Sequence, residues 1–105
     1  MTISKVSEIT ANNLAEYLRI SEADIEDLNT LSTLLSVAKS YVKEYTGQDD
    51  LDKYEDFVIV IFILVQDMWD NRTLYVDIAN FNLTVRTILG LHQVNYYDKR
   101  RQIQS

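Results

Sequence analysis

The side chains best suited to chemistry are one histidine and a group of carboxylates. His92 is the only histidine, and the chain has no cysteine, so thiolate nucleophiles and thiolate metal ligands are excluded. A catalytic site needs a base, an orienting group and a nucleophile within reach of one another, and the sequence places no evident partners beside His92. We therefore expect a solvated or locally hydrogen-bonded histidine, and no enzyme.

The carboxylates gather in a short acidic stretch, at Asp49, Asp50, Asp52, Glu55 and Asp56. A calcium loop needs ligands at set positions and a glycine at its sharp turn, and this stretch has neither. The two glycines of the chain are isolated, so a glycine-rich phosphate loop is absent as well. We expect a solvated helix start here, without a catalytic site, a metal or a cofactor.

The C-terminal residues combine aromatic rings with cations: Tyr96, Tyr97, Lys99, Arg100 and Arg101. Such a cluster could touch nucleic acid, but a formal net charge of −6 opposes binding to phosphates. A solvated end, or a docking point for an acidic partner, is the more common role of three charges in a tail. We expect residues 95–105 to form a flexible tail after a helical domain of residues 1–94.

These groups must be positioned by the stretch that dominates the chain, an unbroken apolar run over residues 57–65 (FVIVIFILV). Residue preference alone would favour a buried strand, because β-branched and aromatic residues fit a pleated surface. The flanks continue the run at helical spacing, however, and no glycine or proline interrupts residues 49–72. We predict a helix over residues 52–72, capped by Asp52 with Glu55 three residues on. The run is too short to span a bilayer, which needs about 20 apolar residues.

A helix that is apolar all round its middle must be covered all round. The cover comes either from its own domain or partly from another protein chain, and the sequence leaves both possibilities open. The structural residues of this helix are expected to be Phe57, Ile61, Leu64, Val65, Trp69 and Arg72.

Three further helices are predicted from apolar periodicity and capping residues. The first covers residues 10–18 with Thr10 as cap, and the second starts at residue 21 or nearer 27 and stops at Gly47. The last covers residues 83–89, between Asn82 as cap and Gly90 as stop. A short connection should make the second helix and the central helix antiparallel neighbours. The expected fold is all-α, a small bundle of about four helices.

Residues 73–81 are the least regular part, and their alternating apolar positions fit either one exposed strand or an extended loop. An unpaired strand edge invites pairing with another chain. The candidate subunit contacts are Tyr75, Val76, Ile78 and Phe81.

The totals fit one soluble domain. The chain has 105 residues, of which 47% are hydrophobic and 25% are charged, as in ordinary globular proteins. Its first ten residues, MTISKVSEIT, lack the apolar core of a signal peptide, so residence in the cytoplasm is expected.

The order of four segments resembles the small head-tail connector proteins of tailed bacteriophages. The segments are residues 13–20 (NLAEYLRI), 38–47 (AKSYVKEYTG), 57–72 with its DMWDNR ending, and 85–92 (VRTILGLH). Each motif alone is weak, and their order and spacing together carry the resemblance, which covers about residues 9–92.

The resemblance implies a non-catalytic adaptor that assembles as a ring, usually dodecameric, beneath the portal. Such a ring joins the portal to tail-side stopper or completion proteins and leaves a channel for DNA, which an acidic surface would suit. Tyr96, Tyr97 and the three cations are then candidates for contact with the portal. The protein would be found in the host cytoplasm during assembly and at the head-tail interface of the virion. The alternative is a small helical regulator, antitoxin-like or chaperone-like, that acts as a dimer.

Overall fold

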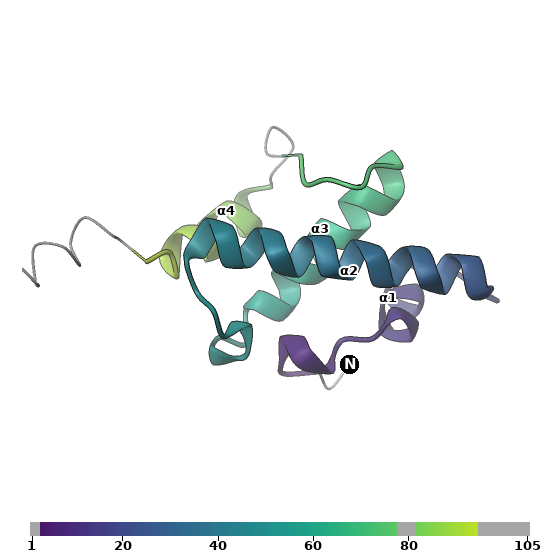
Figure 1. Cartoon of the computed structure of the whole chain (residues 1–105), viewed down its shortest axis with the longest axis horizontal. Helices are drawn as coiled ribbons and strands as arrows, with labels where there is room; N and C mark the ends of the chain where they lie inside the picture. Colours follow the sequence, from purple (N-terminus) through teal and green to yellow (C-terminus); the bar gives the residue numbers. More distant parts are fainter. Residues whose placement is uncertain (1–2, 78–81, 95–105) are drawn as a thin grey trace, which may run out of the picture.

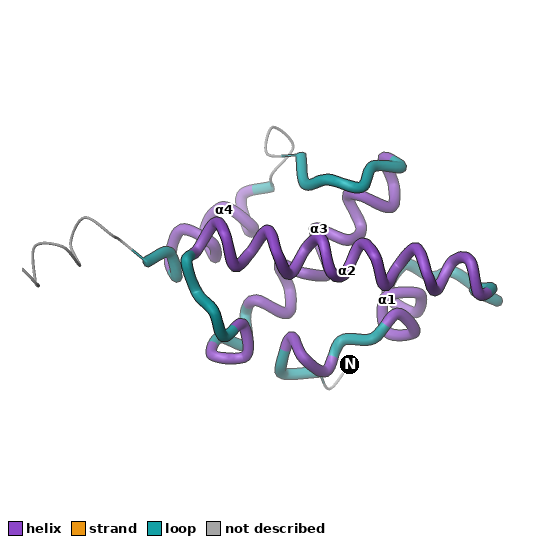
Figure 2. The backbone as a smooth tube through the Cα atoms, in the orientation of Figure 1, coloured by secondary structure: helices purple, strands orange, loops and turns teal. Residues whose placement is uncertain are grey.

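The chain folds as an all-α bundle, as its periodicity predicts (Figure 1, Figure 2). The computed structural model describes residues 3–77 and 82–94. The described part holds four α-helices and two short 3-10 helices and no strand, in the order η1 (Val6–Glu8), α1 (Ala11–Tyr17), α2 (Ile25–Thr46), η2 (Leu51–Lys53), α3 (Phe57–Asn71) and α4 (Leu83–Leu91). None of the helices in these ranges is long and apolar enough to cross a membrane.

The first two helices begin and end where capping chemistry allows. Thr10 Oγ1 accepts a hydrogen bond from the Asn13 N–H at 3.1 Å, which confirms the predicted cap of α1. Helix α2 begins at Ile25, between the two expected starts, because Glu22 has a left-handed backbone (φ 61°) that ends any helix from residue 21. Gly47 closes α2 with φ 72°, and its N–H donates to the Lys43 carbonyl, as predicted.

The start of the central helix differs from the prediction. Helix α3 begins at Phe57, five residues after the expected cap Asp52, because Tyr54 has extended backbone angles (φ −125°, ψ 121°) that interrupt the helix. Asp52 belongs to η2 instead, where its N–H bonds to the Asp50 side chain. The predicted end is confirmed: α3 stops at Asn71, followed by Arg72 in a left-handed conformation.

Helix α4 starts at the predicted cap, where Asn82 Oδ1 accepts from the Val85 N–H at 2.8 Å. The predicted stop at Gly90 is wrong, because the helix continues through Gly90 to Leu91 and His92 forms its C-cap. Gly90 does not have the left-handed backbone that a glycine stop would need.

The bundle is organised by α2 and α3, which cross rather than lie side by side. Figure 1 shows α3 running back behind α2 at a steep angle, so the expected antiparallel pair is only partly correct. The connection through η2 is long enough to turn the chain before α3 begins. Buried residues on α3 meet α1, α2 and α4 in one core, and Leu64, Val65 and Phe57 are nearly inaccessible.

The segment after α3 is a loop over residues 73–77, and no strand forms there. Val76 is half-buried and packs against the core, whereas Leu74 and Tyr75 are exposed. Ile78 and Phe81 lie outside the described residues, as do residues 95–105, so the predicted tail and domain boundary remain predictions.

Candidate functional site

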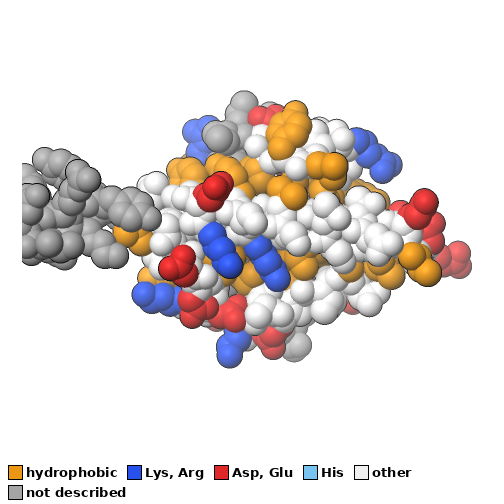
Figure 3. Space-filling view, in the orientation of Figure 1, with side chains coloured by type: hydrophobic (Ala, Val, Ile, Leu, Met, Phe, Trp, Pro, Cys, Tyr) orange, Lys and Arg blue, Asp and Glu red, His pale blue; other side chains and the backbone are white. Residues whose placement is uncertain are grey.

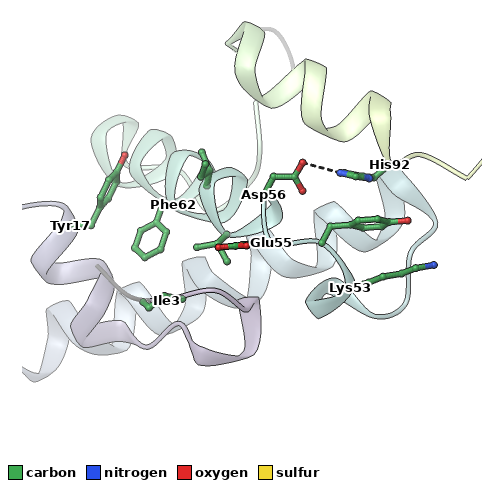
Figure 4. Close-up of a pocket in the computed structure, with 10 residues that line it drawn as sticks. Ile3, Tyr17, Lys53, Glu55, Asp56, Phe62 and His92 are labelled. Carbon is green, nitrogen blue, oxygen red and sulfur yellow. Dashed lines mark hydrogen bonds and ion pairs between the residues drawn. The ribbon is translucent and has the colours of Figure 1, made fainter.

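A groove of about 750 Å³ opens along the N-terminal half of α3 (Figure 4). We call it the α3 groove. Parts of the chain that are distant in sequence meet here: the N-terminal segment, the end of α1, the stretch from η2 into α3, and the end of α4. The lining residues are Ile3, Tyr17, Lys53, Tyr54, Glu55, Asp56, Val58, Ile59, Phe62 and His92.

The wall toward α1 is apolar and held in place by aromatic contacts. The Tyr17 ring lies 4.9 Å from the Phe62 ring in a tilted arrangement, and the Tyr17 hydroxyl donates to Gln66 Oε1 at 3.1 Å. Ile59, in the first turn of α3, lies in the same groove and is 51% exposed, an unusual exposure for an isoleucine in so apolar a helix. These contacts fix the rings before any partner arrives, so the apolar surface is preorganised for binding.

The opposite end of the groove is polar and is built around His92. Its Nε2 lies 2.9 Å from Asp56 Oδ2 (Figure 4). Its ring also stacks on Tyr54, with the ring centroids 3.7 Å apart. The edge of the ring also meets Phe57 at 5.2 Å. The expectation of a histidine without evident partners is therefore wrong, because folding brings together residues 36 positions apart.

Backbone contacts hold this histidine in position at the end of α4. The Gln48 side chain donates to the His92 carbonyl at 2.9 Å, and the Val94 N–H donates to the Thr46 carbonyl at 2.7 Å. The end of α4 is therefore fixed to the end of α2, and the histidine is fixed over the start of α3.

The paired imidazole and carboxylate could orient a proton acceptor, and the groove also holds the Lys53 amine and the Glu55 carboxylate. Tyrosine provides the only hydroxyl groups among the described lining residues, and the Tyr54 ring is stacked on the imidazole. Lys53 and Glu55 are exposed at the rim. The absence of enzyme activity stays a prediction.

The acidic stretch has a structural role at two of its positions. Asp50 caps η2, and Asp52 Oδ1 accepts the Ser7 N–H at 2.9 Å, which ties η2 to η1. Hydrogen bonds from the Ser7 side chain and backbone lower the pKa of Asp52. Within residues 3–77 and 82–94, no group of His, Cys, Asp or Glu side chains is placed to hold a metal ion.

None of the residues expected at interfaces is among the described residues that line this groove. Of the candidate subunit contacts, Tyr75 is exposed and Val76 is partly buried, and Ile78 and Phe81 are outside the described residues. The candidate portal contacts are also outside them, from Tyr96 to Arg101. The structural residues expected in the central helix are packed as predicted, with Phe57, Ile61, Leu64 and Val65 buried and Trp69 half-buried. The Arg72 guanidinium lies 5.5 Å from the centre of the Trp69 ring.

Sequence reasoning missed the α3 groove, although a signal for it exists. Glu55 and Gln66 flank the apolar run and fall on the same side of the helix as Ile59, which marks that side as the exposed one. Tyr17 could be assigned to the groove only once the fold placed α1 beside α3.

Figure 3 shows hydrophobic side chains in bands along both sides of α2 and acidic side chains gathered where α2 begins.

Comparisons with models of protein families, with curated proteins and with solved structures find no significant match. A function must therefore be argued from the geometry of the α3 groove and from the resemblance of the four sequence segments.

Proposed function

We propose that the chain is a structural assembly protein, a head-tail connector of a tailed bacteriophage or prophage. It would form a ring, dodecameric by resemblance, beneath the portal and join the portal to a tail-side stopper or completion protein. It would be made in the host cytoplasm and end at the head-tail interface of the virion. It would act by binding, without catalysis or a cofactor.

The observation that carries this proposal is the exposed apolar lining of the α3 groove. Ile59 is 51% exposed and Tyr17 is 37% exposed in this groove, where a self-sufficient monomer would gain by covering them. A contiguous apolar patch with a charged rim is typical of a protein interaction site. An assembly protein needs such a surface.

The charge of the chain supports a role beside DNA without binding to it. The formal net charge is −6, and phosphate binding depends on lysine and arginine side chains that displace counterions. An acidic wall would repel DNA and let it pass. The all-α fold and the order of the four resembling segments agree with the same proposal.

The test is co-expression with the portal protein encoded in the same genome, followed by gel filtration with light scattering. We expect a complex whose mass exceeds that of the portal by a fixed multiple of 12.2 kDa, the mass of one chain. The multiple gives the number of copies in the ring.

Two surface variants sharpen this experiment. Ile59→Asp should reduce the number of copies bound, because it places a charge in the apolar wall of the groove. Ile25→Asp is the matched control, because Ile25 is 76% exposed and does not line the groove. No complex with the portal, together with a stable dimer of the chain alone, would contradict the connector and favour the small helical regulator.

A further inference from the structure

One side of α3 carries a regular line of positions that the bundle leaves open. Glu55, Ile59, Ile63, Gln66 and Asp70 follow one another at spacings of three or four residues, so they fall within about 80° of one side of the helix. Ile63 is partly buried and the other four residues are exposed. We call these five positions the α3 stripe.

Two hollows lie along the α3 stripe and are bordered by other helices. The α3 groove takes in the first two members of the stripe, and a smaller hollow of about 190 Å³ takes in the last three. Helix α1 borders the stripe through Tyr17, whose hydroxyl donates to Gln66 Oε1. Helix α4 borders it through Asn82, which lines the smaller hollow. Ile59 and Ile63 form an apolar centre between these borders.

Carboxylates lie at both ends of the stripe without a cation of the described chain to neutralise them. Glu55 is at the start, and Asp67 joins Asp70 at the far end. The pair formed by His92 and Asp56 is the one ion pair within residues 3–77 and 82–94, so none of these three carboxylates has a cationic partner there. Burial and then neighbouring carboxylates raise the pKa of Asp67, as expected where negative charge is not neutralised.

This arrangement fits a partner with the complementary pattern of charge. The centre of the stripe can pack against apolar side chains, and its ends can pair with lysine or arginine. An amphipathic helix repeats its apolar residues at the same spacings of three and four, and such helices dock with that side in a groove. Lys53 is the one lysine or arginine that lines either hollow, and its ammonium lies 5.5 Å from the centre of the Tyr54 ring, so carboxylates remain in excess.

A second copy of the chain does not offer this pattern in its described part. Residues 3–77 and 82–94 hold seven lysine and arginine side chains against fifteen carboxylates. No helix in these ranges carries more than two cations, and α2, which carries two, also carries three carboxylates. Like charges would meet at the ends of the stripe and repel. The occupant is therefore expected to come from another protein.

We propose that the α3 stripe binds a basic amphipathic helix of another protein. Its apolar residues pack on Ile59 and Ile63, and its cations lie beside Glu55 at one end and beside Asp67 and Asp70 at the other. The stripe spans roughly 22 Å, about four helical turns, so the two groups of cations are about fifteen residues apart on the partner helix. The inference deepens the proposed function and rests on it, because it names the chemistry of the segment by which an assembly partner docks.

The test uses the full-length chain and a synthetic peptide as the probe. The peptide is a fluorescently labelled helix of about eighteen residues, long enough to cover the stripe, with leucines along one side and lysines at both ends. Titration with the chain, followed by fluorescence anisotropy, should show saturable binding of one peptide per chain. A peptide with glutamates in place of the lysines should bind at least about tenfold more weakly, because like charges would then meet.

Matched variants show whether the peptide binds on the stripe. Ile59→Ala should weaken binding about tenfold, because it removes apolar surface that the peptide covers. Ile25→Ala is its control, since Ile25 is 76% exposed and lines neither hollow, and it should change the affinity by less than about twofold.

The charged end of the stripe is tested in the same way. Asp70→Asn should weaken binding about two- to fivefold at low salt and hardly at all at high salt, where exposed charges are screened. Glu26→Gln makes the same charge change on the exposed start of α2 and should alter the affinity by less than about twofold. Far-ultraviolet circular dichroism confirms that each variant is folded.

Equal losses from the stripe variants and their controls would overturn the inference, because the peptide would then respond only to the overall charge of the chain. Absence of saturable binding would also overturn it. Self-association of the chain that Ile59→Ala abolishes would do the same, because a second copy would then occupy the stripe. The titration contains no portal protein, so its failure is distinguishable from failure of the connector proposal, which the mass of the portal complex tests independently.

Discussion

Two sides of α3 are built from the same residue types and end in different surroundings. On one side Ile61, Leu64 and Val65 are at most 3% exposed in the common core. On the other, Ile59 is 51% exposed in the α3 groove. The difference arises from the neighbouring elements, because α2 and α4 cover the first side and α1 and η1 only partly cover the second. An apolar side chain thus stabilises the fold on one side and is available to a partner on the other.

The largest expected effect on stability comes from placing the same charge on each side of α3 in turn. Leu64→Asp should cost on the order of 3–5 kcal/mol, because it buries an unpaired carboxylate, and total stability is about 5–15 kcal/mol. Ile59→Asp should change the free energy of unfolding by less than about 1 kcal/mol, as substitutions at exposed positions usually do. Urea unfolding followed by the fluorescence of Trp69, the only tryptophan, measures both.

Equal losses from the two variants would contradict the contrast between the two sides. A folded Leu64→Asp protein of unchanged stability would show that the core does not depend on α3. A strongly destabilised Ile59→Asp protein would show that the groove is closed in the free chain.

Helix positions and most caps could be predicted from the sequence because they depend on local chemistry. Thr10, Asn82 and Gly47 act as expected, since a side-chain oxygen or a left-handed glycine completes a helix end without help from distant residues. The start of α3 failed because two acidic residues looked like a cap, and the extended backbone of Tyr54 became visible only in the fold.

The candidate site was less predictable, because its residues meet only through tertiary structure. His92 and Asp56 are 36 positions apart, and Tyr17 and Phe62 come from different helices. Periodicity marks which side of a helix is apolar and does not say which neighbour covers it. The sequence therefore left open whether the chain itself or a partner covers α3, and in the described chain Ile59 is left 51% exposed.

A loss of stability of intermediate size is expected at the polar end of the α3 groove, where His92 at the end of α4 contacts Asp56 and Tyr54 just before α3 begins. His92→Ala removes the contact with Asp56 and the stack on Tyr54, and should lower the free energy of unfolding by about 1–2 kcal/mol. His92→Gln can retain a donor toward Asp56 and should recover part of the loss. Thermal unfolding of the three proteins side by side measures the effect. Unchanged stability in His92→Ala would mean that the His92 contacts with Asp56 and Tyr54 do not stabilise the folded protein.

The smallest effect is expected beyond the groove, at Asp67 in the second half of α3. Burial raises the pKa of Asp67, and the carboxylates of Asp77 and Asp70 raise it further. The native state therefore holds this proton more tightly than the unfolded chain, so the Asp67 contribution to stability is present below the unfolded pKa and is lost as pH rises through the folded value. The ionised carboxylate thus destabilises the protein at neutral pH.

Asp67→Asn should accordingly stabilise the protein at pH 7 by about 0.2–0.5 kcal/mol, the size of a like-charge interaction on a helix surface. The amide keeps a carbonyl oxygen that can accept the bond from Asn71 Nδ2, which is 3.1 Å from Asp67 Oδ1 in the native chain. The gain should shrink as pH falls and vanish below about 3.9, where aspartate is protonated even in the unfolded chain. Urea unfolding at several pH values measures it, with Glu16→Gln on α1 as a control of equal charge change. A gain that persists at low pH would mean that packing, and not ionisation, sets the balance at this end of α3.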